Sequence, residues 1–143
     1  GGSDYEKIKD LAKGSKNIQF MGYTEHGKAI SYMKGSDLIV IPFRDDPILR
    51  GTLSMKPFES IACGKPIIIT NTGQHADIVK NFGAGLVVDA NEEKIAEAII
   101  RLMKNKNEYR SIKRAIKKGK NEVDFRRTRD IFYKKISLLK DDG

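Results

Sequence analysis

Residues 51–79, GTLSMKPFESIACGKPIIITNTGQHADIV, decide the fold of this chain. The stretch predicts a loop, a helix, a strand, a second loop and a second helix, in that order. Ser54 is expected to cap the first helix, because its hydroxyl can accept a hydrogen bond from a free backbone N–H group. Apolar residues then recur at helical spacing from Met55 to Ala62, and Gly64 is expected to end the helix.

The strand of this stretch is predicted from three consecutive isoleucines, residues 67–69. Such a continuous apolar run is typical of a parallel strand that is covered on both faces. Open sheets of parallel strands bind ligands at the carboxyl ends of the strands, where helix starts present free N–H groups to anions. Residues 50–54 are therefore predicted to border a ligand site. Glu59, on the second turn of the helix, is predicted to face the same crevice, where a carboxylate can bind the paired hydroxyl groups of a ribose.

Helices and short strands are predicted to alternate along the rest of the chain. Helical spacing of apolar residues predicts helices at residues 4–13, 25–34, 91–104, 107–120 and 126–139. Alternating or continuous apolar runs predict further strands at residues 17–22, 37–43 and 85–89. This order indicates an α/β, Rossmann-like three-layer domain. Its parallel sheet has about four strands with flanking helices, and two extra C-terminal helices lie at about residues 105–140.

Length and composition indicate one soluble globular domain. The chain has 143 residues, of which 39% are hydrophobic and 32% charged. This composition argues against disorder, and the length is enough to bury a sizeable core. Residues 1–3 resemble a cloning remnant and are left out of the fold, so the domain is expected to comprise residues 4–143.

The single cysteine and the hydropathy pattern indicate the cellular compartment of the protein. Cys63 lies among apolar neighbours, which favours a small core residue over a reactive thiol. One cysteine offers no disulfide framework and suits a reducing compartment. No apolar run is long enough to span a membrane and the N-terminus has no signal segment. A cytoplasmic protein is expected.

The positive charge is concentrated near the C-terminus. Residues 1–100 hold 12 basic and 13 acidic side chains, whereas residues 101–143 hold 15 basic and 6 acidic side chains. The basic C-terminal helices are expected to carry a positive face that binds an anionic membrane surface, which would make the protein peripheral at a membrane. Nucleic acid is not an expected partner, because no aromatic residues are interleaved with the basic ones and no nucleic-acid motif is present.

A family resemblance rests on the opening stretch. SMKPFESIACGKPIII followed by TGQHADIV resembles the motif of two glutamates with seven residues between them in retaining GT-B glycosyltransferases of group 1, family 4. The resemblance extends from about Ser3 to Leu139. It implies the carboxyl-terminal, nucleotide-sugar-binding half of an enzyme that moves a sugar from a nucleotide diphosphate donor to an acceptor held by an amino-terminal domain. No cofactor or metal is implied beyond the nucleotide sugar.

The resemblance implies roles for residues at the start of the first helix. Glu59 is similar to the second glutamate of the motif, which holds the donor ribose; the alternative is a solvated helix face. Gly51 stands where the family has its first glutamate, which departs from the pattern and leaves the sugar contact open. Thr52, Leu53 and Ser54 resemble the loop whose N–H groups approach the sugar and phosphates.

Two further pairs of residues match the family pattern. Gly22 and Tyr23 match the strand end beside the nucleotide base, although a tyrosine in a loop is often simply amphipathic surface. Gly73 and Asp77 match a Gly-Gly-x-x-Glu segment, in which Gln74 replaces the second glycine. Their expected role is structural.

No catalytic residue and no metal site is assigned. His26 and His75 stand alone, without further ligand residues at metal-binding spacing. Arg44, Arg50 and Lys56 form a basic rim near the crevice, but none aligns with the phosphate-binding arginine and lysine of the family.

The resemblance also predicts an incomplete sheet. The family's domain opens with a strand, a Gly-Arg loop reaching a Lys-Gly, a helix and a second strand, and the chain is expected to begin after them. The missing strands would lie between residues 17–22 and residues 37–43. Open edges of this kind predict either a changed pair of neighbouring strands or an oligomer that fills the gap.

Two alternatives to a glycosyltransferase stay open. A sugar-nucleotide 2-epimerase shares the fold and supplies different acid and base residues. A non-enzymatic module would use the basic tail to bind nucleic acid or an anionic membrane.

Overall fold

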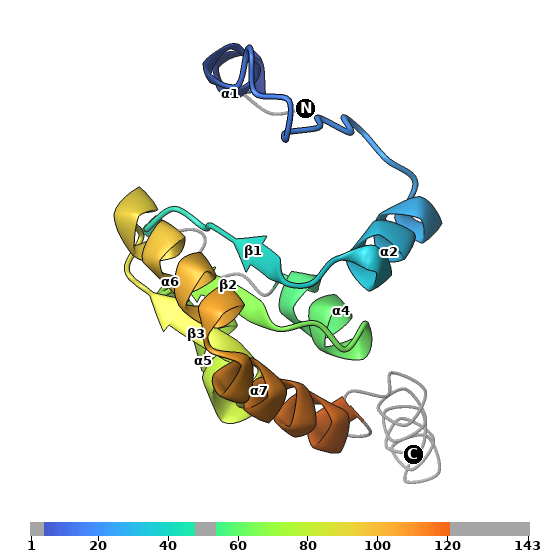
Figure 1. Cartoon of the computed structure of the whole chain (residues 1–143), viewed down its shortest axis with the longest axis vertical. Coiled ribbons are helices and arrows are strands. Elements are labelled where there is room, and N and C mark those ends of the chain that lie inside the picture. The colour runs from blue at the N-terminus through green and yellow to red at the C-terminus, as the bar shows by residue number, and fades with distance from the viewer. Residues whose placement is uncertain (1–4, 48–53, 121–143) are drawn as a thin grey trace, which may run out of the picture.

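The computed structural model describes residues 5–47 and 54–120 (Figure 1). These residues form an α/β fold around a three-stranded sheet in the order β1-β2-β3. The strands are β1 (Ile39–Ile41), β2 (Ile67–Thr70) and β3 (Gly85–Val88). The helices are α1 (Tyr5–Leu11), α2 (His26–Gly35), α4 (Lys56–Ala62), α5 (Gly73–Asn81), α6 (Glu92–Lys104) and α7 (Lys106–Gly119).

Both strand pairs are parallel, as the alternation of strands and helices predicts. Ile39 is paired with Ile67 in one ladder, and Ile67 is paired with Gly85 in the other. A parallel pair needs a crossover connection, and α4 and α5 supply these connections. The sheet therefore runs in chain order, and β1 and β3 are its two edges among the described residues.

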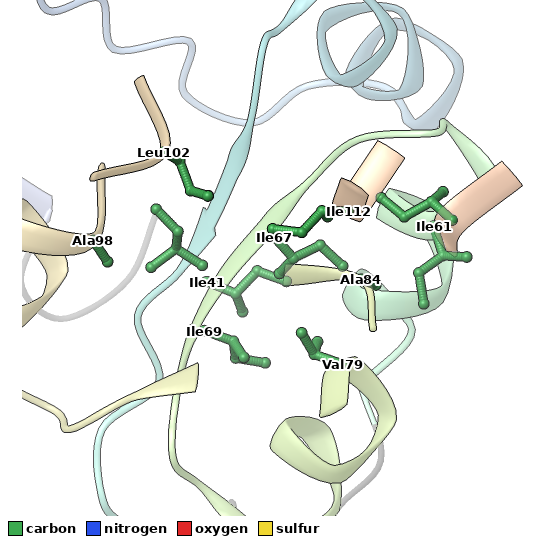
Figure 2. Packing of buried hydrophobic residues seen from close by; sticks show 11 residues of the cluster. Ile41, Ile61, Ile67, Ile69, Val79, Ala84, Ala98, Leu102 and Ile112 are labelled. Atoms are coloured by element: carbon green, nitrogen blue, oxygen red, sulfur yellow. The ribbon is translucent and has the colours of Figure 1, made fainter. Parts of the chain in front are cut away.

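β2 is the centre of the core. All four of its residues are buried, and its three isoleucines are at most 1% exposed. Figure 2 shows Ala98 and Leu102 of α6 on one side of the β2 ribbon and Val79 of α5 on the other. The prediction of a strand covered on both faces is confirmed, and Thr70 extends it by one residue.

Gly85 allows β2 and β3 to approach each other. A side chain at this position would overlap the backbone of Ile67, its partner in the ladder. Glycine is required here by the close approach of two backbones, since its φ angle is not in the left-handed region.

The helix boundaries follow the expected signals with one correction. Gly64 ends α4 with a φ of +72°, and the Asn91 side chain accepts hydrogen bonds from the first turn of α6. Ser54 is not the N-cap of α4, because that position is Met55. The Ser54 hydroxyl still accepts a hydrogen bond from the Lys56 N–H at 3.2 Å, so it acts one residue before the expected place.

The strand predicted at residues 17–22 does not form. Ile18 and Met21 are 52% and 46% exposed, and Phe20 makes an edge contact with Tyr5 of α1. Alternating apolar residues make a strand only where a second strand satisfies the backbone groups, and none lies beside this segment in the described part of the chain. The described sheet thus has three strands instead of about four, and it has no changed neighbour pair. The oligomer that would fill the gap stays a prediction. The helix predicted at residues 126–139 lies outside the described residues.

Candidate functional site

The carboxyl end of the sheet carries a buried polar network. The Thr70 hydroxyl at the end of β2 donates a hydrogen bond to the carbonyl of Phe43, at 2.7 Å, and lies 3.4 Å from the Thr72 hydroxyl. Phe43 follows β1, so this network joins the ends of neighbouring strands. It fixes the backbone where a ligand of an open α/β sheet is expected to bind.

His75 ties the start of the α4 region to this network. Its ring is fully buried, lies 4.6 Å from the ring of Phe43 and accepts a hydrogen bond on Nε2 from the backbone N–H of Ser54, at 2.7 Å. A backbone N–H only donates, so Nε2 carries no proton and Nδ1 carries the hydrogen, 3.4 Å from the carbonyl of Thr72. The neutral imidazole therefore holds Ser54 in place.

The anchoring role of His75 was not predicted from the sequence, where this residue was considered only as a metal ligand. His75 and Ser54 are 21 positions apart, and no local pattern joins them. In residues 5–47 and 54–120, no group of three histidine, cysteine or acidic residues lies in position to hold a metal ion.

Glu59 lies in a groove between α2, β1 and α4. The groove has a volume of about 490 Å³, and its lining includes Lys56, Glu59 and the apolar side chains of β1. The Glu59 side chain is 27% exposed, and its Oε1 lies 3.9 Å from Nδ1 of His26 at the start of α2. The prediction that Glu59 is partly exposed on α4 is confirmed, since it is not enclosed in a core ion pair.

Lys56 gives the same groove a positive charge. It is the first residue of α4, and its ammonium lies 5.9 Å from the centre of the Phe43 ring. One carboxylate, one ammonium and an apolar wall thus meet beside β1. Pockets that bind small molecules have this composition, with a few polar groups set in an apolar surface.

The remaining predicted site residues fall into two groups. Gly51, Thr52 and Leu53 lie outside the described residues, and Ser54 is the first described residue after them. Gly22 has a φ of +61° and Tyr23 is fully exposed, and neither is among the residues that line the groove.

The segment at the start of α5 that matches the family's Gly-Gly-x-x-Glu pattern has a structural role. Gly73 begins the helix with a φ of +53°, which favours glycine, and Asp77 is exposed on its surface. The family's glutamate at this position is therefore matched here by a solvent-facing carboxylate outside the groove.

The fold and the groove define the class of protein. A parallel sheet covered by helices on both faces, with a groove that runs along β1 and past its carboxyl end, is the Rossmann-like arrangement of a GT-B carboxyl-terminal domain. The structure matches sucrose-phosphate synthase from Thermosynechococcus elongatus with a TM-score of 0.81, over 99% of this chain and 36% of that chain. The two sequences are 18% identical, so this match establishes the fold.

The sequence comparisons establish the family. The family model described as "Glycosyl transferases group 1" matches residues 1–119, and the chain belongs to this family. It is also 27% identical over 107 residues to an uncharacterised glycosyltransferase of Methanocaldococcus jannaschii. That alignment covers 73% of this chain and 29% of the relative, so the chain spans under a third of the relative's length. The resemblance to a GT-B glycosyltransferase domain is confirmed.

In the part of the chain that the structure describes, no helix combines the length and apolar character needed to cross a membrane.

Proposed function

We propose that this chain is the donor-binding domain of a retaining glycosyltransferase that moves a sugar from a nucleotide diphosphate to an acceptor. The observation that carries the proposal is the Glu59 carboxylate, which is partly exposed in the groove beside β1. The family membership supports glycosyl transfer. The groove reaches Pro42 and Phe43 just past the carboxyl end of β1, the side of an open α/β sheet on which ligands bind.

Glu59 is the proposed ribose ligand. A carboxylate accepts hydrogen bonds from two adjacent hydroxyl groups at once, and such charge-assisted bonds are stronger than neutral ones. Its neighbour His26 is 75% exposed, so the ring can move aside when a ribose approaches. Gly22 and Tyr23 precede α2 and are the proposed contacts of the nucleotide base.

The diphosphate is proposed to lie near the start of α4. Lys56 supplies a cation on this side of the groove, and Thr52 and Leu53 are the proposed N–H donors. Ser54 cannot offer its own N–H group while that group is bonded to His75. Ser54 is therefore proposed to contribute its hydroxyl and to fix the end of the loop. Gly51 stands where the family has a carboxylate that contacts the sugar.

The acceptor is proposed to bind another part of the enzyme. The chain spans 29% of its Methanocaldococcus relative and 36% of the sucrose-phosphate synthase chain, so a complete enzyme of this kind has room for an acceptor-binding domain. We expect this chain alone to bind donor weakly and to transfer no sugar.

The test uses nuclear magnetic resonance titration, which detects weak binding, with a panel of nucleoside diphosphates and their 2′-deoxy analogues. Glu59→Gln is expected to weaken the best nucleoside diphosphate by about tenfold or more, the size of one charge-assisted hydrogen bond. Glu6→Gln, a change of the same kind on exposed α1, is the matched control and is expected to leave affinity unchanged.

The deoxy analogue makes the test specific for the ribose. Removal of the 2′-hydroxyl should weaken binding to the unchanged protein. It should cost little further affinity in Glu59→Gln, because the substitution has already removed the hydrogen bond between that hydroxyl and the carboxylate. Equal losses in both proteins would place the ribose elsewhere. Release of free nucleotide or an epimerised sugar by the full-length protein with donor alone would instead indicate an epimerase.

A further inference from the structure

The net positive charge of the chain comes from one short segment. Residues 101–120 hold nine basic side chains and one acidic side chain, Glu108, so this segment accounts for the net charge of +8 of the whole protein. Residues 121–143 hold six basic and five acidic side chains and add little to it. Most of these basic residues belong to α7, so the surface of α7 is where an anionic partner would bind.

Five basic residues of α7, together with the lysine that follows the helix, form a band that we call the cationic stripe. It consists of Lys106, Arg110, Lys113, Arg114 and Lys117 of α7 and of Lys120 just after it. The members are three or four positions apart, except for the adjacent Lys113 and Arg114, and this spacing places them along one side of a helix. The band is about 21 Å long, from 14 residues at the rise of an α-helix.

The cationic stripe is exposed to solvent because the opposite side of α7 packs against the core. Ile112 and Ile116 are buried there, whereas every stripe residue except Lys113 is exposed. Lys113 donates a hydrogen bond to the carbonyl of Gly64 at 2.7 Å. Among residues 5–47 and 54–120, none of the stripe residues forms an ion pair, and the acid of α7, Glu108, is paired with Arg101.

Exposed apolar side chains lie at one end of the cationic stripe. Ile100 and Met103 of α6 are 53% and 56% exposed and are three positions apart, so they share one side of the helix. Met103 lines the same hollow, of about 410 Å³, as Lys106 and Arg110. Asn105 alone connects the two helices, so the end of α6 that carries this pair is followed directly by the start of the cationic stripe (Figure 1).

We propose that the cationic stripe is a docking surface for an anionic phospholipid bilayer. A straight row of cations matches a flat, negatively charged surface, and each basic residue near such a surface adds to the attraction. Ile100 and Met103 would enter the boundary between headgroups and acyl chains, as apolar side chains of interfacial helices do. This surface lies on α6 and α7, so the inference does not depend on the donor site proposed in the groove.

The composition of the surface favours lipid over nucleic acid. Proteins that bind single strands stack aromatic side chains on bases. The aromatic residue of α7, Tyr109, is half-buried and donates its hydroxyl to the carbonyl of Asp37. The exposed neighbours of the stripe are aliphatic instead, and these gain nothing from a phosphate backbone in water.

Vesicle co-sedimentation with the full chain tests the proposal. We expect retention on vesicles of phosphatidylcholine mixed with phosphatidylglycerol, little retention on phosphatidylcholine alone, and a steep loss on addition of salt. The triple variant Arg110→Glu, Arg114→Glu, Lys117→Glu is expected to lose about a hundredfold in partition coefficient, at about fivefold for each cation removed. The matching neutral variant, with glutamine at the same three positions, should lose nearly as much.

The control separates this surface from net charge. Lys7→Glu, Lys9→Glu and Lys16→Glu change the net charge by the same amount at exposed positions of the N-terminal segment. They should leave most of the binding, and far-UV circular dichroism checks that every variant is folded. An equal loss of vesicle binding in the stripe variant with glutamates and in this N-terminal variant would overturn the proposal. It would show that net charge, and not a defined surface, causes the attraction.

Two further measurements complete the test. Met103→Ser with Ile100→Ser should weaken binding several-fold at high salt, where only the apolar contribution remains, while Ile8→Ser with Leu11→Ser should not. Tighter binding of an RNA duplex than of the anionic vesicles at the same salt concentration would overturn the assignment to lipid.

Discussion

β2 and residues 17–22 are both predicted to be strands, yet they have different structures. Both are short runs rich in large apolar side chains, and both predict a strand. In β2 the isoleucines are at most 1% exposed, whereas Ile18 is 52% and Phe20 37% exposed. The difference teaches that an apolar run becomes a strand only where other elements pair with its backbone and cover its side chains. β2 has a parallel strand on each edge and helices on each face.

The same contrast extends to the helices. α1 has no buried residue and stands apart from the sheet in Figure 1, whereas α6 and α7 bury aliphatic residues against the core. The described chain thus consists of a packed part, residues 37–120 without the undescribed loop, and an N-terminal segment, residues 5–36, whose helices α1 and α2 contain no buried residue. Paired substitutions of one residue type in each part measure how different the two are.

The largest effect is expected at the contact between β2 and β3. Gly85→Ala would place a methyl group on the backbone of Ile67, and no side-chain movement relieves that overlap. We expect a loss of at least about 5 kcal/mol in the free energy of unfolding, which is outside the usual range for one substitution. Gly27→Ala, in α2 with open space around it, should change stability by less than about 1 kcal/mol, and it should stabilise rather than destabilise. Urea denaturation measures both, and a folded Gly85→Ala protein would contradict the register of this ladder.

A matched pair of isoleucines measures burial directly. Ile69→Ala in β2 should cost about 2 to 5 kcal/mol, because it removes buried surface and leaves a cavity. Ile18→Ala should stay within about 0.5 kcal/mol, as for an exposed residue. Chemical denaturation of the two variants under one condition gives the comparison. A large loss in Ile18→Ala would show that the N-terminal segment packs in solution against something that this arrangement lacks.

The two histidines extend the comparison to polar groups. His75→Leu should cost about 1 to 3 kcal/mol, because the partly buried N–H of Ser54 loses its acceptor. His26→Leu replaces a side chain that is 75% exposed and should have little effect on stability. If His75 also holds the donor loop, His75→Leu should weaken nucleotide binding while His75→Asn, which keeps an acceptor, restores part of it. Nitrogen-15 spectra of the imidazole should show the hydrogen on Nδ1, and a hydrogen on Nε2 would contradict the anchoring role.

The elements that the sequence predicts correctly are those with strong local signals. Three consecutive isoleucines, the glycine at position 64 and the asparagine cap at position 91 each act within a few residues, and β2, α4 and α6 have nearly the expected bounds. The failed strand at residues 17–22 depends on a partner strand, which no local pattern encodes. Element type was therefore predictable wherever the neighbours are supplied by the described chain.

The candidate site was predictable only through Glu59. The sequence predicts it on the second turn of a helix that begins near Ser54. The structure has it in the first turn of α4, which begins at Lys56, and in the groove. The contact from His75 to Ser54 and that from His26 to Glu59 join distant segments, so they become visible only after folding. Gly22 and Tyr23 remain predictions, because their assignment to the base depends on a ligand contact.

The smallest effect is expected from a pair of tyrosines, and it depends on pH. Tyr109 of α7 donates its hydroxyl to the carbonyl of Asp37, just before β1, at 2.9 Å. Tyr109→Phe should cost about 0.5 to 1.5 kcal/mol at neutral pH, the net value of one hydrogen bond. Burial raises the pKa of Tyr109 above its ordinary value, and the nearby charge of Asp37 raises the pKa further.

The sign of the pH dependence follows from that direction. The folded protein binds the phenol proton more tightly than the unfolded chain does, so this stabilisation is complete below the unfolded pKa of about 10 and is lost as the pH rises through the folded pKa. The stability difference between the unchanged protein and Tyr109→Phe should therefore shrink in alkaline solution, as measured by urea denaturation across that range. Tyr23→Phe, at a fully exposed position of the N-terminal segment, should show no difference at any pH. A difference for Tyr109→Phe that grows with alkaline pH would mean that the phenolate is favoured in the folded protein, and α7 would then not be joined to β1 in the way that this hydrogen bond requires.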